Sequence, residues 1–219
     1  MDLFDYMRTN TMKSEAPLAS RMRPETLEEI VGQQHIIGKD KLLYRAIKAD
    51  KISSLIFYGP PGTGKTTLAK VIANTTSADF VQMNATTSGK KDMEQAVSQA
   101  KDAFGMYGKK TILFIDEIHR FNKAQQDYLL PFVEDGTVIL IGATTENPYF
   151  EVNSALLSRS QIFHLEPLSQ KDICKLVKTA VEDNERGMGA YGAEITEEAA
   201  QFIAQMAGGD ARRALNAVE

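Results

Sequence analysis

The sequence has a single cysteine, Cys174, and no tryptophan. No disulfide can therefore form within the chain, and a reducing compartment suits it. Its stability must come from a packed core. With 219 residues, of which 43% are hydrophobic, the chain is long enough to build one α/β domain and part of a second.

Long hydrophobic runs are also missing. The longest apolar stretches, such as TILFI and TVILIGA, fall far short of the ~20 residues that span a bilayer. The first residues, MDLFDYMRTNTMKSEAP, are polar and acidic, whereas a signal peptide would begin basic and then turn apolar. We therefore expect a cytoplasmic protein that does not contact a membrane.

Positive charge is not in excess, because 25 Lys and Arg stand against 29 Asp and Glu, a formal net charge of −4. This balance excludes a surface coated broadly for nucleic acid, but it leaves room for a narrow basic strip. Lys90-Lys91 and Lys109-Lys110 are candidate phosphate contacts. The alternative is that these lysines, beside helices and turns, are only solvated.

Short strands rich in Ile, Val and Phe alternate with helical segments along most of the chain. The strand candidates are LIFYG, FVQMN, TILFID and VILIGATT, and helices are expected from Lys65, Lys90 and Lys123. This alternation predicts an α/β fold in which helices flank a parallel sheet. After Pro167 the pattern becomes helical, with Ser169 and Thr196 as N-cap candidates.

We accordingly expect three parts. Residues 1–16 have few apolar residues and predict a flexible arm; residues 17–166 predict the α/β domain; and residues 167–219 predict a helical lid domain. The last part ends inside a helical pattern without a cap, so we expect it to be truncated.

A glycine-rich stretch, GPPGTGKT, occupies residues 59–66 and matches the pattern GxxxxGK[ST] between a strand and a helix. The glycines let successive N–H groups point at phosphate oxygens, and the donors must start at Gly62 because Pro60 and Pro61 have no N–H. Lys65 would reach the β- and γ-phosphates, and the Thr66 hydroxyl would ligate Mg²⁺. A chance match is the alternative, and the strand–loop–helix context argues against it.

Two carboxylates, Asp116 and Glu117, follow the apolar strand TILFI. The carboxyl ends of parallel strands face the ligand crevice, so Asp116 is placed to hold Mg²⁺ and Glu117 to polarise an attacking water. Such acidic pairs often only cap the next helix. This pair follows a phosphate loop by about one crossover connection, which favours its interpretation as a metal-binding and catalytic pair. His119 receives no role, because a histidine at a helix start is more often structural.

The strand VILIGATT also ends in hydroxyls, at Thr144 and Thr145. A hydroxyl there could hydrogen-bond a γ-phosphate or the attacking water. The strand could equally run into a turn at Glu146-Asn147-Pro148. The chemistry of the residues leaves both interpretations open.

Together these segments resemble the AAA+ ATPases, from Pro17 to the end of the chain. GPPGTGKTT is similar to the family's Walker A motif, which adds Thr63, Gly64 and Thr67 to the nucleotide contacts, and ILFIDE is similar to its Walker B motif. Thr145 aligns with the position called sensor 1. The resemblance implies an ATPase that uses ATP and Mg²⁺.

Three further segments carry the same resemblance. The stretch from Arg23 to Gln33 is similar to the segment that cradles adenine, which implies contacts from Val31 and Gly32. LSRS, where the clamp-loader-like branch more often reads Ser-Arg-Cys, implies an arginine finger at Arg159. GDARRALN is similar to the sensor 2 helix and implies that Arg212 lies over the phosphates. For Arg159 the alternative is a structural ion pair with Glu151 or Glu166.

Within AAA+, the segments DEIHRFNKAQQD, IGATTENPYFEVNSALLSR and GDARRALN are similar to the replication-associated recombination protein A (RarA, also MgsA) family. Its eukaryotic relative is Werner-helicase-interacting protein. The resemblance implies a homo-oligomer acting on forked or single-stranded DNA at stalled replication forks, associated with the nucleoid and with single-stranded-DNA-binding protein. That family continues past the sensor 2 helix into helices that carry oligomerisation, whereas this sequence stops at Glu219.

Two other functions remain open. One is a clamp-loader-like scaffold in which ATP sets the shape and turnover is slight, and the other is a Holliday-junction branch-migration motor that shares ATT at the strand end. The intact Glu117 favours hydrolysis over the scaffold. The sequence Thr-Glu-Asn-Pro that begins at Thr145 favours the replication-fork ATPase over the motor.

Overall fold

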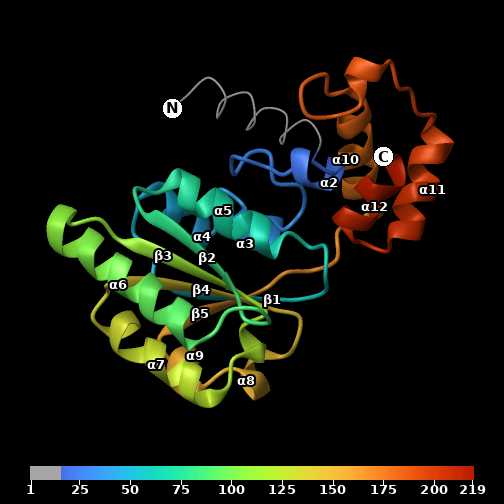
Figure 1. Ribbon diagram of the computed structural model, residues 1–219. Coiled ribbons are helices and arrows are strands. Elements are labelled where there is room, and N and C mark those ends of the chain that lie inside the picture. Colours follow the sequence, from blue (N-terminus) through green and yellow to red (C-terminus); the bar gives the residue numbers. More distant parts are fainter. Residues whose placement is uncertain (1–15) are drawn as a thin grey trace. The chain divides into compact units, whose positions relative to one another are not determined.

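The computed structural model describes residues 16–219, so the expected arm, except its last residue, lies outside the described residues. The chain forms two compact units. One is an α/β unit, Glu25–Glu166, and the other is a helical unit in which Pro167–Glu219 joins the segment that ends at Pro24. Figure 1 labels the helices and strands of both units.

A parallel sheet of five strands forms the centre of the α/β unit, in the order β2-β3-β4-β1-β5. The strands are β1 (Ser54–Tyr58), β2 (Asp79–Asn84), β3 (Thr111–Asp116), β4 (Val138–Thr144) and β5 (Ser160–His164). β3 and β4 are almost wholly buried, which explains their near-continuous apolar sequence. The predicted α/β fold is confirmed.

Helices cover both faces of this sheet (Figure 1). The main ones are α4 (Leu42–Lys48), α5 (Lys65–Thr75), α6 (Lys90–Tyr107) and α7 (Lys123–Glu134); the shorter ones are α3 (Gln34–Ile37), η1 (Ile118–Arg120), α8 (Pro148–Glu151) and α9 (Ser154–Leu157). One apolar cluster joins α3, α4 and α5 to the sheet, and a second joins α6, α7 and α9 to it. The starts predicted for α5, α6 and α7 are confirmed.

A glycine in β4 lets the turn after β3 pack closely on the sheet. A Cβ on Gly142 would lie 2.7 Å from Cδ1 of Ile56 and 2.9 Å from Cδ1 of Ile118. Ile118, which is fully buried, follows the two carboxylates at the end of β3 directly. The close packing therefore fixes the backbone that carries those carboxylates.

The helical unit consists of α2 (Leu18–Arg21), α10 (Gln170–Glu182), η2 (Gly189–Tyr191), α11 (Glu197–Ala207) and α12 (Ala211–Val218). Ser169 caps α10 by accepting the N–H of Asp172 at 3.1 Å, and Thr196 caps α11 by accepting the N–H of Ala199 at 3.2 Å. Both predicted N-caps are confirmed. Among the helices described, none has the length and apolar character to span a membrane.

The first described residues pack on the helical unit. The sequence pattern assigns residue 17 onward to the α/β domain, whereas in the structure Leu18 and Met22 lie in one apolar cluster with Leu176 and Leu215. The N–H of Leu18 also donates to Oε1 of Glu219 at 3.0 Å. The physical reason is that α2 has only four residues, too few to show a periodic pattern, and its apolar side chains complete the core between α10 and α12.

Candidate functional site

The glycine-rich loop follows β1 and leads into α5, as its motif requires. Gly59, Gly62 and Gly64 have φ values of 145°, 70° and 98°, a region that favours glycine. A Cβ on Gly59 would lie 2.1 Å from the carbonyl oxygen of Leu165. Gly64 is the N-cap of α5 and has no capping side chain, so the first N–H groups of the helix can bind an anion.

Lys65 and Thr63 are buried within this loop, whereas Pro60 and Pro61 are exposed. Nζ of Lys65 donates to the carbonyl oxygens of Gly59 and Pro60 at 2.7 and 2.8 Å, and Oγ1 of Thr63 donates to that of Pro60 at 2.9 Å. A buried cation surrounded by curved backbone provides a strong attraction for an anionic ligand.

Thr66 meets Asp116 although the two are 50 residues apart in the sequence: Oγ1 of Thr66 donates to Oδ2 of Asp116 at 3.3 Å. A hydroxyl and a carboxylate are hard oxygen ligands of the kind that Mg²⁺ prefers. Among the residues that the structure describes, no three or more His, Cys, Asp or Glu side chains form a metal-binding group. Two oxygen ligands on one side suit an ion whose remaining ligands are phosphates and water.

Glu117 follows Asp116 in a left-handed conformation, with φ 55°. Such a backbone is uncommon for a residue other than glycine and tends to occur at functional sites. Oε2 of Glu117 lies 3.4 Å from Nε2 of His119, and Nδ1 of His119 lies 2.8 Å from Oγ1 of Thr144. His119, which received no role from the sequence, thus connects the carboxyl ends of β3 and β4.

Thr145 lies one residue beyond the end of β4 and is exposed, whereas Thr144 is wholly buried. The Thr144 hydroxyl accepts the N–H of Glu146 at 3.0 Å. β4 pairs with β1 on one side and β3 on the other. Thr145 therefore follows β4, which lies between β1, the strand before the glycine-rich loop, and β3, the strand that ends at the carboxylates.

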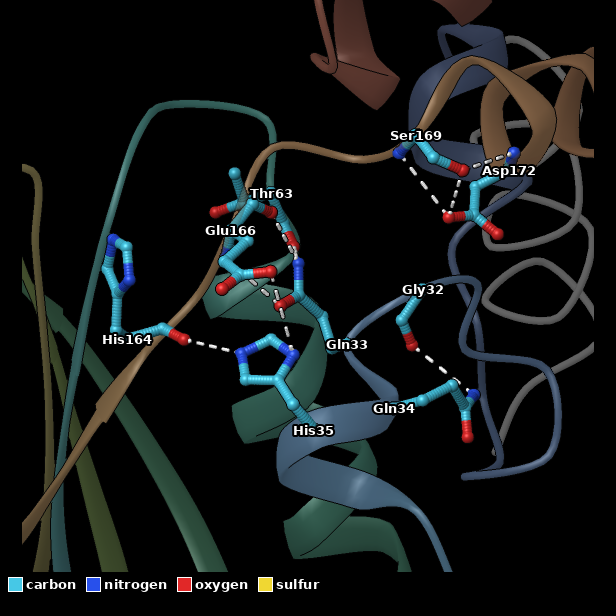
Figure 2. Close-up of polar contacts among 9 residues, drawn as sticks. All are labelled: Gly32, Gln33, Gln34, His35, Thr63, His164, Glu166, Ser169 and Asp172. Carbon is cyan, nitrogen blue, oxygen red and sulfur yellow. Dashed lines mark hydrogen bonds and ion pairs between the residues drawn. The ribbon is translucent and has the colours of Figure 1, made fainter.

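The segment upstream of β1 is joined to the loop by Gln33, whose side chain is shown in Figure 2. Gln33 is buried; its Nε2 donates to the carbonyl oxygens of Thr63 at 3.3 Å and Glu166 at 2.7 Å, and its Oε1 accepts the N–H of Glu166 at 3.1 Å. The sequence pointed to Val31 and Gly32 but missed this amide. One side chain connects the segment beside Gly32, the loop and the chain after β5.

Three further contacts fix the carboxyl end of β5 and the residues that follow it. Nε2 of His35 lies 3.0 Å from the carbonyl oxygen of His164, and Nδ1 of His35 lies 4.0 Å from Oε2 of Glu166; dashed lines mark both contacts in Figure 2. The His164 ring stacks on Tyr58, with centroids 4.7 Å apart. The segment from His164 to Glu166, in which Leu165 lies against Gly59, is thereby held by His35 and Tyr58.

Arg159 follows α9 and forms an ion pair with Glu134 at the end of α7, with NH2 2.6 Å from Oε1. Its NH1 also donates to the carbonyl oxygen of Ala155 at 2.9 Å and to Oγ of Ser158 at 3.1 Å. The structural ion pair considered from the sequence therefore involves Glu134 and not Glu151 or Glu166. The Arg159 side chain is 41% exposed, so it remains accessible to solvent.

Arg212 belongs to the helical unit, where it is exposed in the first turn of α12. Asp210 caps this helix by accepting the N–H of Arg213 at 3.0 Å. The structure thus brings the loop, Thr66, Asp116, Glu117 and the β4 end together in the α/β unit, and it places Arg212 on the other unit.

Residues 55–168, which include the loop, both carboxylates and Arg159, match the ATPase family associated with various cellular activities (AAA). The chain belongs to this family. It is 52% identical over 203 residues to replication-associated recombination protein A of Escherichia coli K12, across 93% of the chain and 45% of that protein. Bacillus subtilis has a protein of the same name that is 49% identical over 203 residues, across 93% of the chain and 47% of the relative.

A eukaryotic relative is ATPase WRNIP1 of Dictyostelium discoideum, which is 42% identical over 216 residues, across 99% of the chain and 24% of that protein. The chain spans about half the length, or less, of these curated AAA relatives. The resemblance inferred from the sequence motifs is confirmed by these matches.

Solved structures of RuvB from Thermotoga maritima share the fold. One variant superposes with a TM-score of 0.75 at 29% identity, and the protein titled a Holliday junction branch migration motor superposes with a TM-score of 0.72 at 30% identity. Each comparison covers 90% of this chain and 64% of the RuvB chain. The likeness confirms an AAA+ P-loop fold.

Replacing Gln33 by leucine should destabilise the α/β unit, because the carbonyl oxygens of Thr63 and Glu166 and the N–H of Glu166 lose their partner. We expect the free energy of unfolding to fall by roughly 1–3 kcal/mol and ATP binding to weaken. The control is Gln34→Leu, since Gln34 is exposed and makes only a 3.4 Å contact with Gly32. Equal denaturant midpoints for the two variants would contradict a structural role of the Gln33 amide.

Proposed function

We propose that this chain binds ATP with Mg²⁺ and hydrolyses it to ADP and phosphate, and that this activity serves DNA transactions in replication-fork maintenance and recombination. The observation that carries the enzymatic part is the contact between Thr66 and Asp116 at 3.3 Å. It joins the phosphate loop to the strand whose next residue, Glu117, can act on water.

In this proposal the loop holds the triphosphate. The N–H groups of Gly62, Thr63 and Gly64, together with Lys65, bind the phosphate oxygens. The residues that complete the loop are Pro60 and Pro61, which shape its entry, and Thr67, which follows it on α5. Val31 and Gly32 contact the base.

Thr66 and Asp116 hold the metal ion in this scheme, which when bound offsets the negative charge of the β- and γ-phosphates. Glu117 orients the attacking water and accepts its proton. Thr145 hydrogen-bonds the γ-phosphate or the water. Each role fits the place of the residue at the carboxyl edge of the sheet.

Two arginines complete the proposed machinery. Arg159 acts on the γ-phosphate of a neighbouring subunit in a homo-oligomer, where a guanidinium can raise the rate roughly 10³–10⁵-fold. The 41% exposure of its side chain is compatible with such a role. Arg212 responds to the bound nucleotide from the helical unit.

The DNA part of the proposal rests on the relatives, which are named for replication-associated recombination. Forked or single-stranded DNA is the proposed substrate, single-stranded-DNA-binding protein a proposed partner, and the cytoplasmic nucleoid the proposed location. With a net charge of −4, the DNA surface must be narrow or assembled across subunits. Of the paired lysines, Lys90 and Lys109 form exposed ion pairs with Glu94 and Asp79, and both pairs of lysines stay candidate phosphate contacts.

The likeness to RuvB supports a second candidate, a branch-migration motor. The higher identity to replication-associated recombination protein A favours the first. Measuring ATP turnover with forked, single-stranded and four-way-junction DNA separates the two. Stimulation by forked or single-stranded DNA supports the first, stimulation by the junction alone supports the motor, and slow turnover with every DNA supports the scaffold.

Two substitutions test ATP chemistry directly. Lys65→Ala should abolish tight ATP binding, because it removes the cation of the phosphate loop.

Glu117→Gln should retain ATP binding but stall hydrolysis, by roughly 10²–10⁴-fold, since the amide keeps the size of the side chain and cannot accept a proton. Binding is measured with a fluorescent nucleotide and turnover by phosphate release. Wild-type binding in the first variant, or near wild-type turnover in the second, would refute the assignment.

Replacing Arg159 by alanine in the assembled oligomer should leave ATP binding and the melting temperature unchanged and slow hydrolysis on the order of 10³-fold or more. The control is Glu134→Gln, which removes the same ion pair. If Arg159 serves only that pair, both variants lose stability equally. If it is a finger, the Glu134 variant keeps its turnover.

A mixing experiment checks that Arg159 acts between subunits. A mixture of Arg159→Ala and Lys65→Ala oligomers should regain part of the lost activity, because a mixed interface can pair an intact ATP site with an intact finger. The proposal fails if subunits are shown to exchange and the mixture is no more active than its parts.

A further inference from the structure

We propose that His119 is a positioning residue for ATP hydrolysis, which holds the carboxylate of Glu117 and ties it to the end of β4 through Thr144. This inference rests on the proposed function, in which Glu117 activates the attacking water. It gives a role to His119, to which the sequence assigned none, and makes Thr144 the residue that holds its ring.

The contacts form a continuous line across the carboxyl edge of the sheet. Oε2 of Glu117 lies 3.4 Å from Nε2 of His119, and Nδ1 of the same ring lies 2.8 Å from Oγ1 of Thr144. The side chain of His119 is only 7% exposed and Thr144 is fully buried, whereas the side chain of Glu117 is 31% exposed. The line therefore runs from the protein interior to a carboxylate that water can reach.

The two ring nitrogens of His119 face different partners. The Thr144 hydroxyl already accepts the N–H of Glu146 at 3.0 Å, so its own hydrogen can point to Nδ1 of His119. Nδ1 can accept this hydrogen, and Nε2 is the ring nitrogen that faces the carboxylate of Glu117.

The backbone that carries this ring is itself well anchored. His119 lies in the 3₁₀ turn η1, which the N–H of Arg120 closes by donating to the carbonyl oxygen of Glu117 at 2.8 Å. Ile118 is buried against Gly142. A fixed turn with a fixed ring limits the rotamers of Glu117, which reduces the ordering needed when water is activated.

The contact between His119 and Thr144 also connects the imidazole ring to the end of β4. Thr144 immediately precedes Thr145, the proposed contact of the γ-phosphate or the water. A small displacement of this strand end moves the Thr144 hydroxyl, and with it the imidazole that faces Glu117. In this way the end of β4, which carries the proposed substrate contact Thr145, positions the Glu117 carboxylate. His119 itself does not touch the substrate.

A matched pair of substitutions separates this role from a merely structural one. The amide of asparagine reaches about as far as Nδ1 of histidine, so His119→Asn keeps the Thr144 link and loses the contact with Glu117. The amide of glutamine reaches about as far as Nε2, so His119→Gln keeps a donor at Glu117. Each variant is the other's control for polarity and burial.

We expect His119→Asn to lower kcat roughly 10–100-fold, and His119→Gln to stay within about threefold of the wild type. The Kd for a fluorescent ATP analogue should change less than about threefold in both, since neither removes a phosphate contact. Thr144→Val should lower kcat in the same direction, and its effect should not add to that of His119→Asn, because both act on one line of contacts.

Wild-type turnover in His119→Asn would overturn the inference, as would equal losses of kcat in the asparagine and glutamine variants accompanied by equal losses of melting temperature. If the histidine variants fail to fold, Thr144→Val decides, and a kcat within about twofold of the wild type overturns the inference. Glu117→Gln in the same assay tests the proposed function separately. If the wild type does not hydrolyse ATP, or Glu117→Gln does, the proposed function itself fails and the inference with it.

Discussion

The parallel direction of all five strands is the constraint on which the site depends. Because β1, β3 and β4 run the same way and lie side by side, their carboxyl ends meet at one edge. The glycine-rich loop, the carboxylates and the threonines follow these three strands, which explains why Thr66 and Asp116 touch across 50 residues. The site is a consequence of strand order, and the loop alone would not create it.

The phosphate loop is also tied to the chain that leaves the sheet. Gly59 approaches the backbone of Leu165 so closely that a Cβ would lie 2.1 Å from its carbonyl oxygen, and the Gln33 amide bonds both Thr63 and Glu166. A buried amide with all these partners resists displacement, because breaking them leaves polar groups unpaired. The residue after Glu166 begins the main segment of the helical unit. The Gln33 amide therefore joins the loop at Thr63 to the last residue before that segment.

The local features of the fold could be predicted from the sequence, because they depend on short patterns. Apolar runs gave the strands, the GxxxxGK[ST] pattern fixed the start of α5, and Ser169 and Thr196 marked the starts of α10 and α11. The proximity of Asp116 to the loop followed from the general geometry of parallel sheets. The roles of the individual site residues remain predictions.

Partner choice over long sequence separations could not be predicted. Gln33 and Glu166 are 133 residues apart, His119 and Thr144 are 25 apart, and which acid would meet Arg159 depended on how α7 and α9 pack. A buried glutamine or a helix-start histidine has the same local sequence whether or not it finds such a partner. For the same reason, the sequence could not predict that Leu18 packs in the helical unit.

We propose that strand order creates one metal–nucleotide site from Thr66 and Asp116. Its most direct test is the binding of Mn²⁺, as a paramagnetic substitute for Mg²⁺, titrated with and without ATP. We expect ATP to strengthen the binding of one ion per chain, and Thr66→Val to weaken this ATP-dependent binding roughly tenfold or more while metal-free ATP binding persists. Mn²⁺ affinity that is independent of ATP, or unchanged by Thr66→Val, would contradict a site shared by metal and nucleotide.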